Sequence, residues 1–111
     1  MDKIAKYRKI LTDYLQSVAQ DWPHNASEEV KPIFDQNSNH FMVVHYGWTE
    51  YGHLHSVPIH LEIRESKVWI QENLTEIEID DDLVARGIPK SDIVLGMLPP
   101  EYRVFSEYAA A

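Results

Sequence analysis

Histidine is the residue type that could do chemistry in this chain, since six of the 111 residues are histidines. His53 and His55 are two apart in a predicted strand and share one face, and His45 has the other parity. His60 is predicted to share the face of His45, but about four rows away, on the order of 13 Å at strand rise. Zinc ligands must lie about 2 Å from one point. The spacing therefore predicts half-buried or edge histidines, with no metal and no cofactor.

Carboxylates offer a second chemistry, because six acids fall between Glu72 and Asp82. No base or oxyanion donor is placed beside them, so they are interpreted as a solvated acidic segment that supplies the first turn of a helix. No G-x-S-x-G, P-loop or G-x-G-x-x-G pattern occurs among the four glycines. We therefore predict no catalytic residues and no enzyme activity. A small histidine-dependent nuclease or hydrolase stays open as the alternative.

Composition narrows the classes of protein further. The length predicts a single domain over residues 1–111. There is no cysteine and no apolar run near the roughly 20 residues of a membrane span, so we expect a cytoplasmic protein. Ten basic residues face eighteen acidic ones, a net charge of -8. Lys3, Lys6, Arg8 and Lys9 form the one small basic patch. Direct nucleic-acid binding is not expected, whereas a partner with a basic surface is.

The elements that must position these residues follow from periodicity. Apolar residues at spacings of three and four predict a helix over 2–20, with Asp2 as N-cap. The period then changes to two. Strands are predicted at 30–35, 40–48, 53–63 and 67–72, a short helix at 83–86 before Gly87, and helical turns at 91–95 and 101–108. The fold class is thus α+β: an N-terminal helix packed on a four-stranded antiparallel β-meander, followed by short C-terminal helical segments.

Turn lengths assign the two faces of this meander. Counting from the turn at 49–52 opposes Val44 to Val57 and Met42 to Ile59. The predicted core face consists of Ile33, Met42, Val44, Val57, Ile59, Leu61, Ile63, Val68 and Ile70. The other face carries large apolar groups among a few polar ones, which is unusual for a solvated face. Its members are Phe34, Phe41, Val43, Pro58, His60, Glu62, Trp69 and Gln71.

Two hypotheses compete for what covers that second face. In one, the C-terminal segment with Val104, Phe105 and Tyr108 folds over it. In the other, it is an interface with another copy or with a different protein. The candidate partner-binding residues are Phe34, Phe41, His60, Trp69 and, at the strand end, Trp48. Gly47, before Trp48, is interpreted as a bulge or close-packing position.

Several ordered motifs carry a family resemblance. They are His40-Phe-Met-Val-Val-His-Tyr-Gly-Trp48, Ile59-His-Leu-Glu-Ile63, Lys67-Val-Trp-Ile-Gln-Glu72, Thr75-Glu76, Leu83-Val84, Gly87-Ile-Pro-Lys-Ser-Asp-Ile-Val-Leu-Gly96 and Pro99-Pro100. Over nearly its whole length the chain resembles the XisI-like proteins, the fdxN-element excision controlling factors of cyanobacteria. One departure is Asn73-Leu74-Thr75-Glu76, where an Asp-Gly-Thr-Glu-like stretch is expected.

The resemblance implies an accessory factor and not an enzyme. The family is tied to programmed excision of a DNA element during heterocyst differentiation, a DNA rearrangement whose recombination chemistry belongs to a separate site-specific recombinase. It implies an XisH-like protein as partner, with the recombinase machinery as a further option. The homodimer rests instead on the second face described above. It carries over no catalytic residues.

Overall fold

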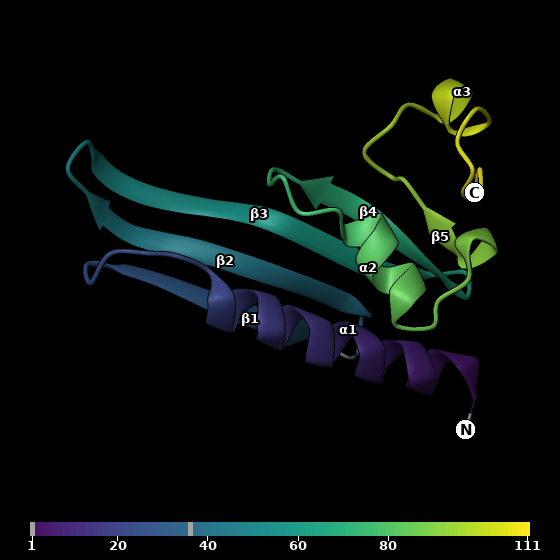
Figure 1. The fold of residues 1–111 in the computed structure, drawn as a ribbon, viewed down its shortest axis with the longest axis horizontal. Helices are drawn as coiled ribbons and strands as arrows, with labels where there is room; N and C mark the ends of the chain where they lie inside the picture. Colours follow the sequence, from purple (N-terminus) through teal and green to yellow (C-terminus); the bar gives the residue numbers. More distant parts are fainter. Residues whose placement is uncertain (1, 36) are drawn as a thin grey trace.

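A helix and a five-stranded sheet make up most of the molecule (Figure 1). The computed structural model describes residues 2–35 and 37–111. The elements in order are α1 (Lys3–Asp21), β1 (Glu28–Asp35), β2 (His40–Thr49), β3 (Gly52–Arg64), β4 (Lys67–Asn73), α2 (Ile79–Ala85), the 3-10 turn η1 (Lys90–Asp92), β5 (Ile93–Val94) and α3 (Pro100–Arg103). The predicted α+β class is confirmed, with one strand more than expected.

Helix α1 forms where the apolar spacing predicts it. Asp2 caps its start, since the side chain accepts a hydrogen bond of 2.8 Å from the backbone N–H of Ala5. The helix ends at Asp21, just before Trp22-Pro23, because a residue before proline disfavours helical geometry. One face of α1 is buried against the sheet, through Tyr7, Leu11, Tyr14, Leu15 and Ala19.

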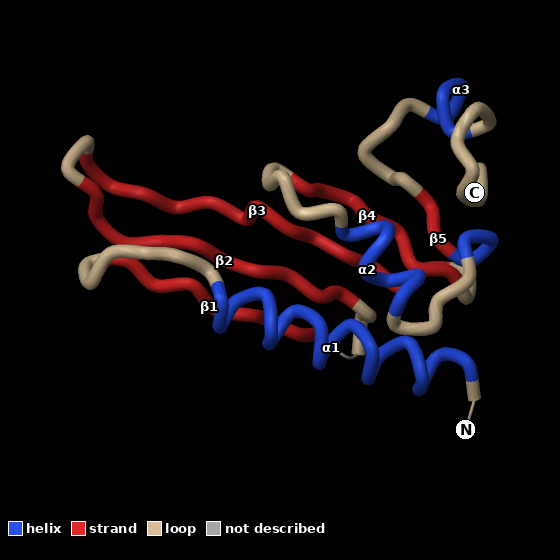
Figure 2. Tube along the Cα trace, in the orientation of Figure 1, coloured by secondary structure: helices blue, strands red, loops and turns tan. Residues whose placement is uncertain are grey.

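The sheet has the strand order β1-β2-β3-β4-β5 (Figure 2). The first four strands are antiparallel neighbours, as the short connections predict. The predicted helical turn at 91–95 is wrong in its second half. There Ile93 and Val94 pair with Val68 and Trp69 as a short parallel strand. Both are β-branched and fully buried, so burial at a sheet edge outweighs local helical preference.

A register shift in β3 changes the predicted faces. The predicted pair Met42–Ile59 is wrong, because Ile59 opposes Val43 and His60 opposes Met42, while Val44 and Val57 of the other predicted pair both fall within the irregularity. The irregularity includes Pro58, which has no N–H to give to the ladder and is found within sheets chiefly at edges and bulges. Because β3 has one extra residue at the irregularity, residues 40–43 of β2 pair with β3 one position away from the predicted register. Since side chains alternate between faces, a one-residue shift exchanges the two faces.

The exchange places the core as follows. Phe41 and Val43 are fully buried in the cluster that packs on α1, and Phe34 is partly buried against the same cluster, with its ring 6.0 Å from that of Phe41. Ile33 is 44% exposed, so its predicted core position is wrong. Met42, Val44 and Val57 likewise lie outside this core cluster. The predictions for β3 and β4 are confirmed: Ile59, Leu61, Ile63, Val68 and Ile70 all belong to the core.

Helices α1 and α2 lie over the same face of the sheet, α1 across β1 and β2 and α2 across β3 and β4 (Figure 1). Helix α2 starts at Ile79, with Asp80, Asp81 and Asp82 in its first turn as predicted. Gly87 follows its end with φ of 110°, the left-handed C′ position that the sequence indicates. The predicted helix at 101–108 is shorter than expected, a single turn at Pro100–Arg103.

Gly47 generates the first prediction. A Cβ built there would lie 2.3 Å from the carbonyl oxygen of Ser27, and φ is 133°. Gly47→Ala combines backbone clash with backbone strain and should lower the free energy of unfolding by about 2–4 kcal/mol, since such strain alone costs about 1–3 kcal/mol.

Gly52→Ala is the matched control for urea denaturation. Gly52 has a similar φ of 124° but nothing within 4 Å of the added Cβ, so only the strain contributes and the loss should be smaller. Equal losses in the two variants would show that the contact with Ser27 is unimportant.

Candidate protein-interaction site

The side of the sheet opposite α1 and α2 is the first candidate site. Over β1, β2 and β3 no element among residues 2–35 and 37–111 covers it (Figure 1). We name this surface the open face. Its members are Glu29, Lys31, Ile33, Asp35, His40, Met42, Val44, Tyr46, Trp48, His53, His55, His60 and Glu62. Trp48 is 62% exposed and its ring lies 5.0 Å from that of His53. Three residues on this face, Ile33, Tyr46 and Trp48, count among the exposed large apolar side chains.

The structure brings together only part of the predicted site. His60 lies on the open face, as expected, and Trp48, which was predicted only to lie at the strand end, also lies on it. Phe34 and Phe41 do not, because the register shift turns both toward α1. Trp69 lies on the same side as the open face but is only 7% exposed, so it offers little surface to a partner.

Trp69 is covered by arginines. The Arg64 and Arg103 guanidinium groups lie 5.0 and 5.2 Å from its ring centre, in cation–π geometry. Arg103 is fixed in turn by the backbone of its own segment, since its Nε donates to the carbonyls of Leu95 and Leu98, at 3.2 and 3.0 Å. The C-terminal segment therefore covers the β4 end of this side of the sheet.

The residues predicted to form that cover are not the ones that do so. Val104 and Phe105 are 64% and 84% exposed. Tyr108 is partly buried against the core cluster, and its hydroxyl donates to Asp80 of α2 at 2.9 Å. The hypothesis of intramolecular cover is thus correct for Trp69 alone, through Arg103. On the open face Val44 is buried and Met42 and His60 are half-buried, whereas Ile33, Tyr46 and Trp48 are exposed.

The histidines fall into two groups that the sequence did not separate correctly. His45 faces α1, whereas His60 lies on the open face, so the prediction that they share a face is wrong. His60 instead contacts His40, with 2.9 Å between their ring nitrogens. Burial lowers the pKa of His60, and His40 beside it acts in the same direction. Among the described residues, no group of three or more His, Asp or Glu side chains could hold a metal ion.

His45 belongs to a nearly buried polar pair below the loop after α1. Its Nε2 lies 2.6 Å from Oε1 of Glu28, and Asn25 donates to the other carboxylate oxygen at 3.0 Å. The ring of Trp22 covers His45 edge-on, at 5.9 Å. The hydrogen bond to His45 is the main cause that lowers the pKa of Glu28. The pair fixes the start of β1 against β2, and it has no access to a substrate.

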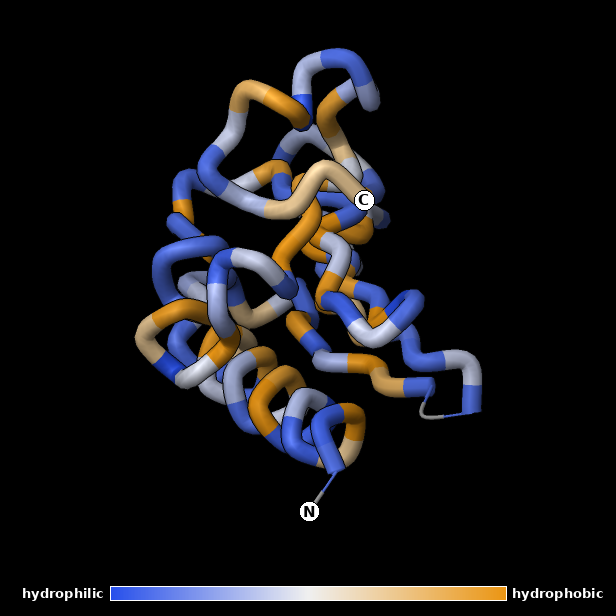
Figure 3. Tube along the Cα trace, turned by 90° about the vertical axis from the view of Figure 1, so that its right-hand side faces the viewer, coloured by the Kyte–Doolittle hydropathy of each residue, from blue (hydrophilic) through white to orange (hydrophobic). Residues whose placement is uncertain are grey.

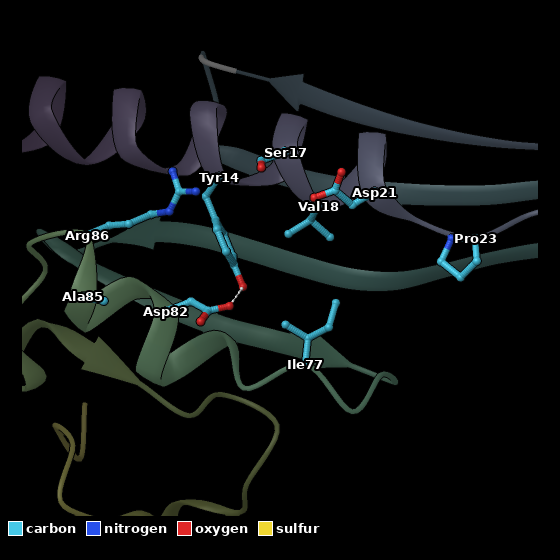
Figure 4. A pocket seen from close by; sticks show the side chains of 9 residues that line it. All are labelled: Tyr14, Ser17, Val18, Asp21, Pro23, Ile77, Asp82, Ala85 and Arg86. Atoms are coloured by element: carbon cyan, nitrogen blue, oxygen red, sulfur yellow. Dashed lines mark hydrogen bonds between the residues drawn. The ribbon is translucent and has the colours of Figure 1, made fainter.

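A groove between α1 and α2 is the second candidate site (Figure 4). It has a volume of about 550 Å³. Its lining consists of Tyr14, Ser17, Val18, Asp21, Pro23, Ile77, Asp82, Ala85 and Arg86. The hydroxyl of Tyr14 crosses the groove and donates to Asp82 at 2.6 Å, while Arg86 lies over the Tyr14 ring at 5.0 Å. A shallower apolar hollow continues it past Trp22 and Leu74.

Acidic side chains surround this groove. Within the described residues, no Lys, Arg or His nitrogen lies within 4.0 Å of a carboxylate between residues 76 and 82. The carboxylates are close together at Glu78, where the hydrogen bond to Asp81 is the main cause that raises the pKa of Glu78. Asp21 is exposed on the rim of the groove and Glu76 on the rim of the adjoining hollow. Arg86 is the one cation that the described part of the chain contributes to the lining of the groove. The other charged groups along this rim are carboxylates, so the surface suits a basic, partly apolar segment.

The basic residues of α1 do not line this groove, and most of them pair with other side chains of the protein. Lys3 pairs with Asp92 at 2.9 Å and Lys9 with Asp13 at 3.0 Å. Arg8 donates to the Asn39 side chain at 2.9 Å. These contacts reduce the charge available to a phosphate backbone. The view from the end that holds both termini shows hydrophilic and hydrophobic positions alternating along α1 (Figure 3). No helix in the described part of the chain is both long and apolar enough to cross a membrane.

The fold defines a small α+β domain. The model of the XisI protein family matches residues 1–110, and the chain belongs to that family. Its structure is similar to the crystal structure of an XisI-like protein from Anabaena variabilis, with 32% identity, a TM-score of 0.92 and coverage of 97% of this chain and 99% of that one.

A second crystal structure, of the fdxN element excision controlling factor XisI from Anabaena variabilis, is also similar. Its identity is 27%, its TM-score is 0.76, and the match covers 99% of this chain and 100% of that one. The comparison with curated proteins gave no match.

The Glu28–His45 pair gives a prediction of pH dependence. The folded-state pKa of Glu28 lies below its unfolded value of about 4.5, so the stability it contributes is present above that pH and is lost as the pH falls through the folded-state pKa. Glu28→Gln should therefore cost stability at pH 6, and the difference from the wild type should shrink at pH 3.

Urea denaturation of both proteins at the two pH values measures this, with Glu29→Gln as the control, because Glu29 is exposed on the adjacent position of β1. A difference between wild type and Glu28→Gln that is as large at pH 3 as at pH 6 would contradict an ionic contribution.

Arg103 gives a prediction about the C-terminal segment. Arg103→Ala removes both the stacking on Trp69 and the bonds to carbonyls, and should cost about 1–2 kcal/mol of stability. Amide hydrogen exchange over residues 95–106 should become faster. Arg64→Ala removes stacking alone and should leave that exchange rate nearly unchanged. Equal exchange in the two variants would show that Arg103 does not hold the segment.

Proposed function

We propose that this protein is a non-enzymatic regulatory factor for the programmed excision of a DNA element, acting in the cytoplasm through contacts with other proteins. The observation that carries the proposal is the family match over residues 1–110, together with likeness along the whole chain to a protein named as an excision controlling factor. The recombination itself belongs to a separate site-specific recombinase, in the setting of cyanobacterial heterocyst differentiation.

The partner we propose is an XisH-like protein, bound at the groove between α1 and α2. Support comes from the charge of the groove, since the exposed rim residues Asp21 and Glu76 have no cationic partner within 4.0 Å in the described part of the chain. A basic segment would neutralise the rim while its apolar side chains fill the space beside Val18 and Ile77. Complementary charge of this kind speeds encounter and fixes orientation more than it adds affinity.

A pull-down with an XisH-like protein tests this assignment. The double variant Asp21→Lys/Glu76→Lys reverses the rim charge and should weaken binding at least about tenfold, which corresponds to 1.4 kcal/mol. The control is Glu50→Lys/Glu101→Lys, which changes the net charge equally at exposed positions away from the groove. It should bind like the wild type.

Two outcomes would contradict the groove assignment. One is equal loss in both double variants, which would indicate a general charge effect. The other is full binding by the groove variant together with loss in Trp48→Glu, which would place the XisH-like protein on the open face instead.

A further inference from the structure

The open face has a charge pattern unlike the rest of the molecule. Between Phe41 and Leu61 the only Asp, Glu, Lys or Arg is Glu50, which sits in the β2–β3 turn. On β1, Glu29 and Lys31 pair with each other at 3.4 Å, and Asp35 is engaged with the backbone N–H groups of Asn37 and Ser38. On β3, Glu62 accepts from Gln71 at 3.0 Å and lies 3.8 Å from His40. The central part of the open face thus carries few charges for a chain of net charge -8, and its carboxylates lie toward the β1 and β4 sides.

The acidic residues lie on the other side. The acids of α2 belong to the layer that covers the core face, and the groove between α1 and α2 lies in that same layer (Figure 1). Two copies that meet through their open faces therefore keep these acidic clusters at the outside of the pair. The centre of the open face offers little complementary charge to a strongly basic or acidic partner, whereas a second copy presents the same exposed apolar side chains to it.

The area of the open face limits the affinity expected of a contact formed through it. β2 has ten residues, which span about 34 Å, and three strands span about 14 Å. The footprint is then on the order of 480 Å², compared with about 800 Å² per partner in a standard interface. Large exposed apolar surfaces usually mark contacts, and a symmetric pair buries the same patch twice. We propose that the open face is the interface of a homodimer of moderate affinity, formed by antiparallel or crossed stacking of two sheets.

The β4 end of the sheet limits where the second copy can lie. There Arg103 covers Trp69 and the C-terminal segment occupies the surface, so the second copy is confined to β1, β2 and β3. Ile33 and Trp48 both project from this region and are exposed enough to be changed without loss of folding. Phe105, also exposed but located in the C-terminal segment, is the matched control.

Light scattering after size exclusion, from about 1 to 300 µM, tests the proposal. We expect the mass of the wild type to rise toward twice that of one chain. Ile33→Glu and Trp48→Glu should raise the dissociation constant at least about tenfold, because each would bury an unpaired carboxylate. Phe105→Glu should behave like the wild type. A wild-type mass of one chain over the whole range, or dissociation caused by Phe105→Glu alone, would overturn the proposal.

The absence of cysteine permits a second measurement. Single variants Ile33→Cys, Tyr46→Cys and Phe105→Cys are treated with a bismaleimide cross-linker of about 10 Å. We expect covalent dimers with the first two and none with Phe105→Cys. The reverse pattern would reject the open face even if a dimer exists. The assay does not involve the XisH-like protein, so its failure leaves the proposed function intact, and a failed pull-down leaves the dimer intact.

Discussion

The irregularity at Val57–Pro58 is the constraint that decides which side chains of this sheet meet α1. β3 lies between β2 and β4, so its backbone groups are needed on both sides, and a proline there lacks its N–H. The strand accommodates this with one extra residue. As a result Val43 and Phe41 turn inward and Met42 turns outward. Without the shift, α1 would lie on a face that carries His40 and Met42.

Hydroxyl groups then connect the C-terminal elements to this core. Tyr7 donates to Asp92, the last residue of η1, and Tyr14 donates to Asp82 of α2. Tyr108 donates to Asp80. Burial raises the pKa of these tyrosines, and each carboxylate acceptor raises it further, so all three remain donors at neutral pH. Part of the acidic segment is thus structural, and the carboxylates left over define the charge of the groove.

The sequence predicts the element order, because the change of period from helix to strand is clear and the turns are short. Next to the turn it predicts the β3–β4 register correctly, with Ile63 opposite Val68 and Leu61 opposite Ile70, since the Glu65-Ser66 turn has the positive φ angles that a tight hairpin turn requires. A second irregularity, between His60 and Leu61, shifts the rest of this pairing. It does not predict which side chains of β1 and β2 face the core, since counting from a turn assumes an unbroken ladder of backbone hydrogen bonds. Pro58 within a central strand was the available signal for the bulge.

For the candidate site, the wrong predictions have the same origin. Phe34 and Phe41 were placed on the second face by the parity of an unshifted β2. Trp48 was a candidate for its place at the strand end and not by parity, and it lies on the open face. The contact between His40 and His60 also depends on the shifted register, so spacing alone could not show it. The stacking of Arg103 on Trp69 joins residues 34 positions apart through a loop, which no periodic pattern encodes.

The two surfaces are separated by the sheet itself, and this separation bears on how a regulatory factor of this size can work. Side chains alternate along one set of strands, so the open face and the core share the same backbone, whereas the groove belongs to the helices on the opposite side. A contact at one surface does not block the other. The proposed dimer contact and the proposed groove contact can therefore form at the same time, which is the property that the proposed regulatory role needs.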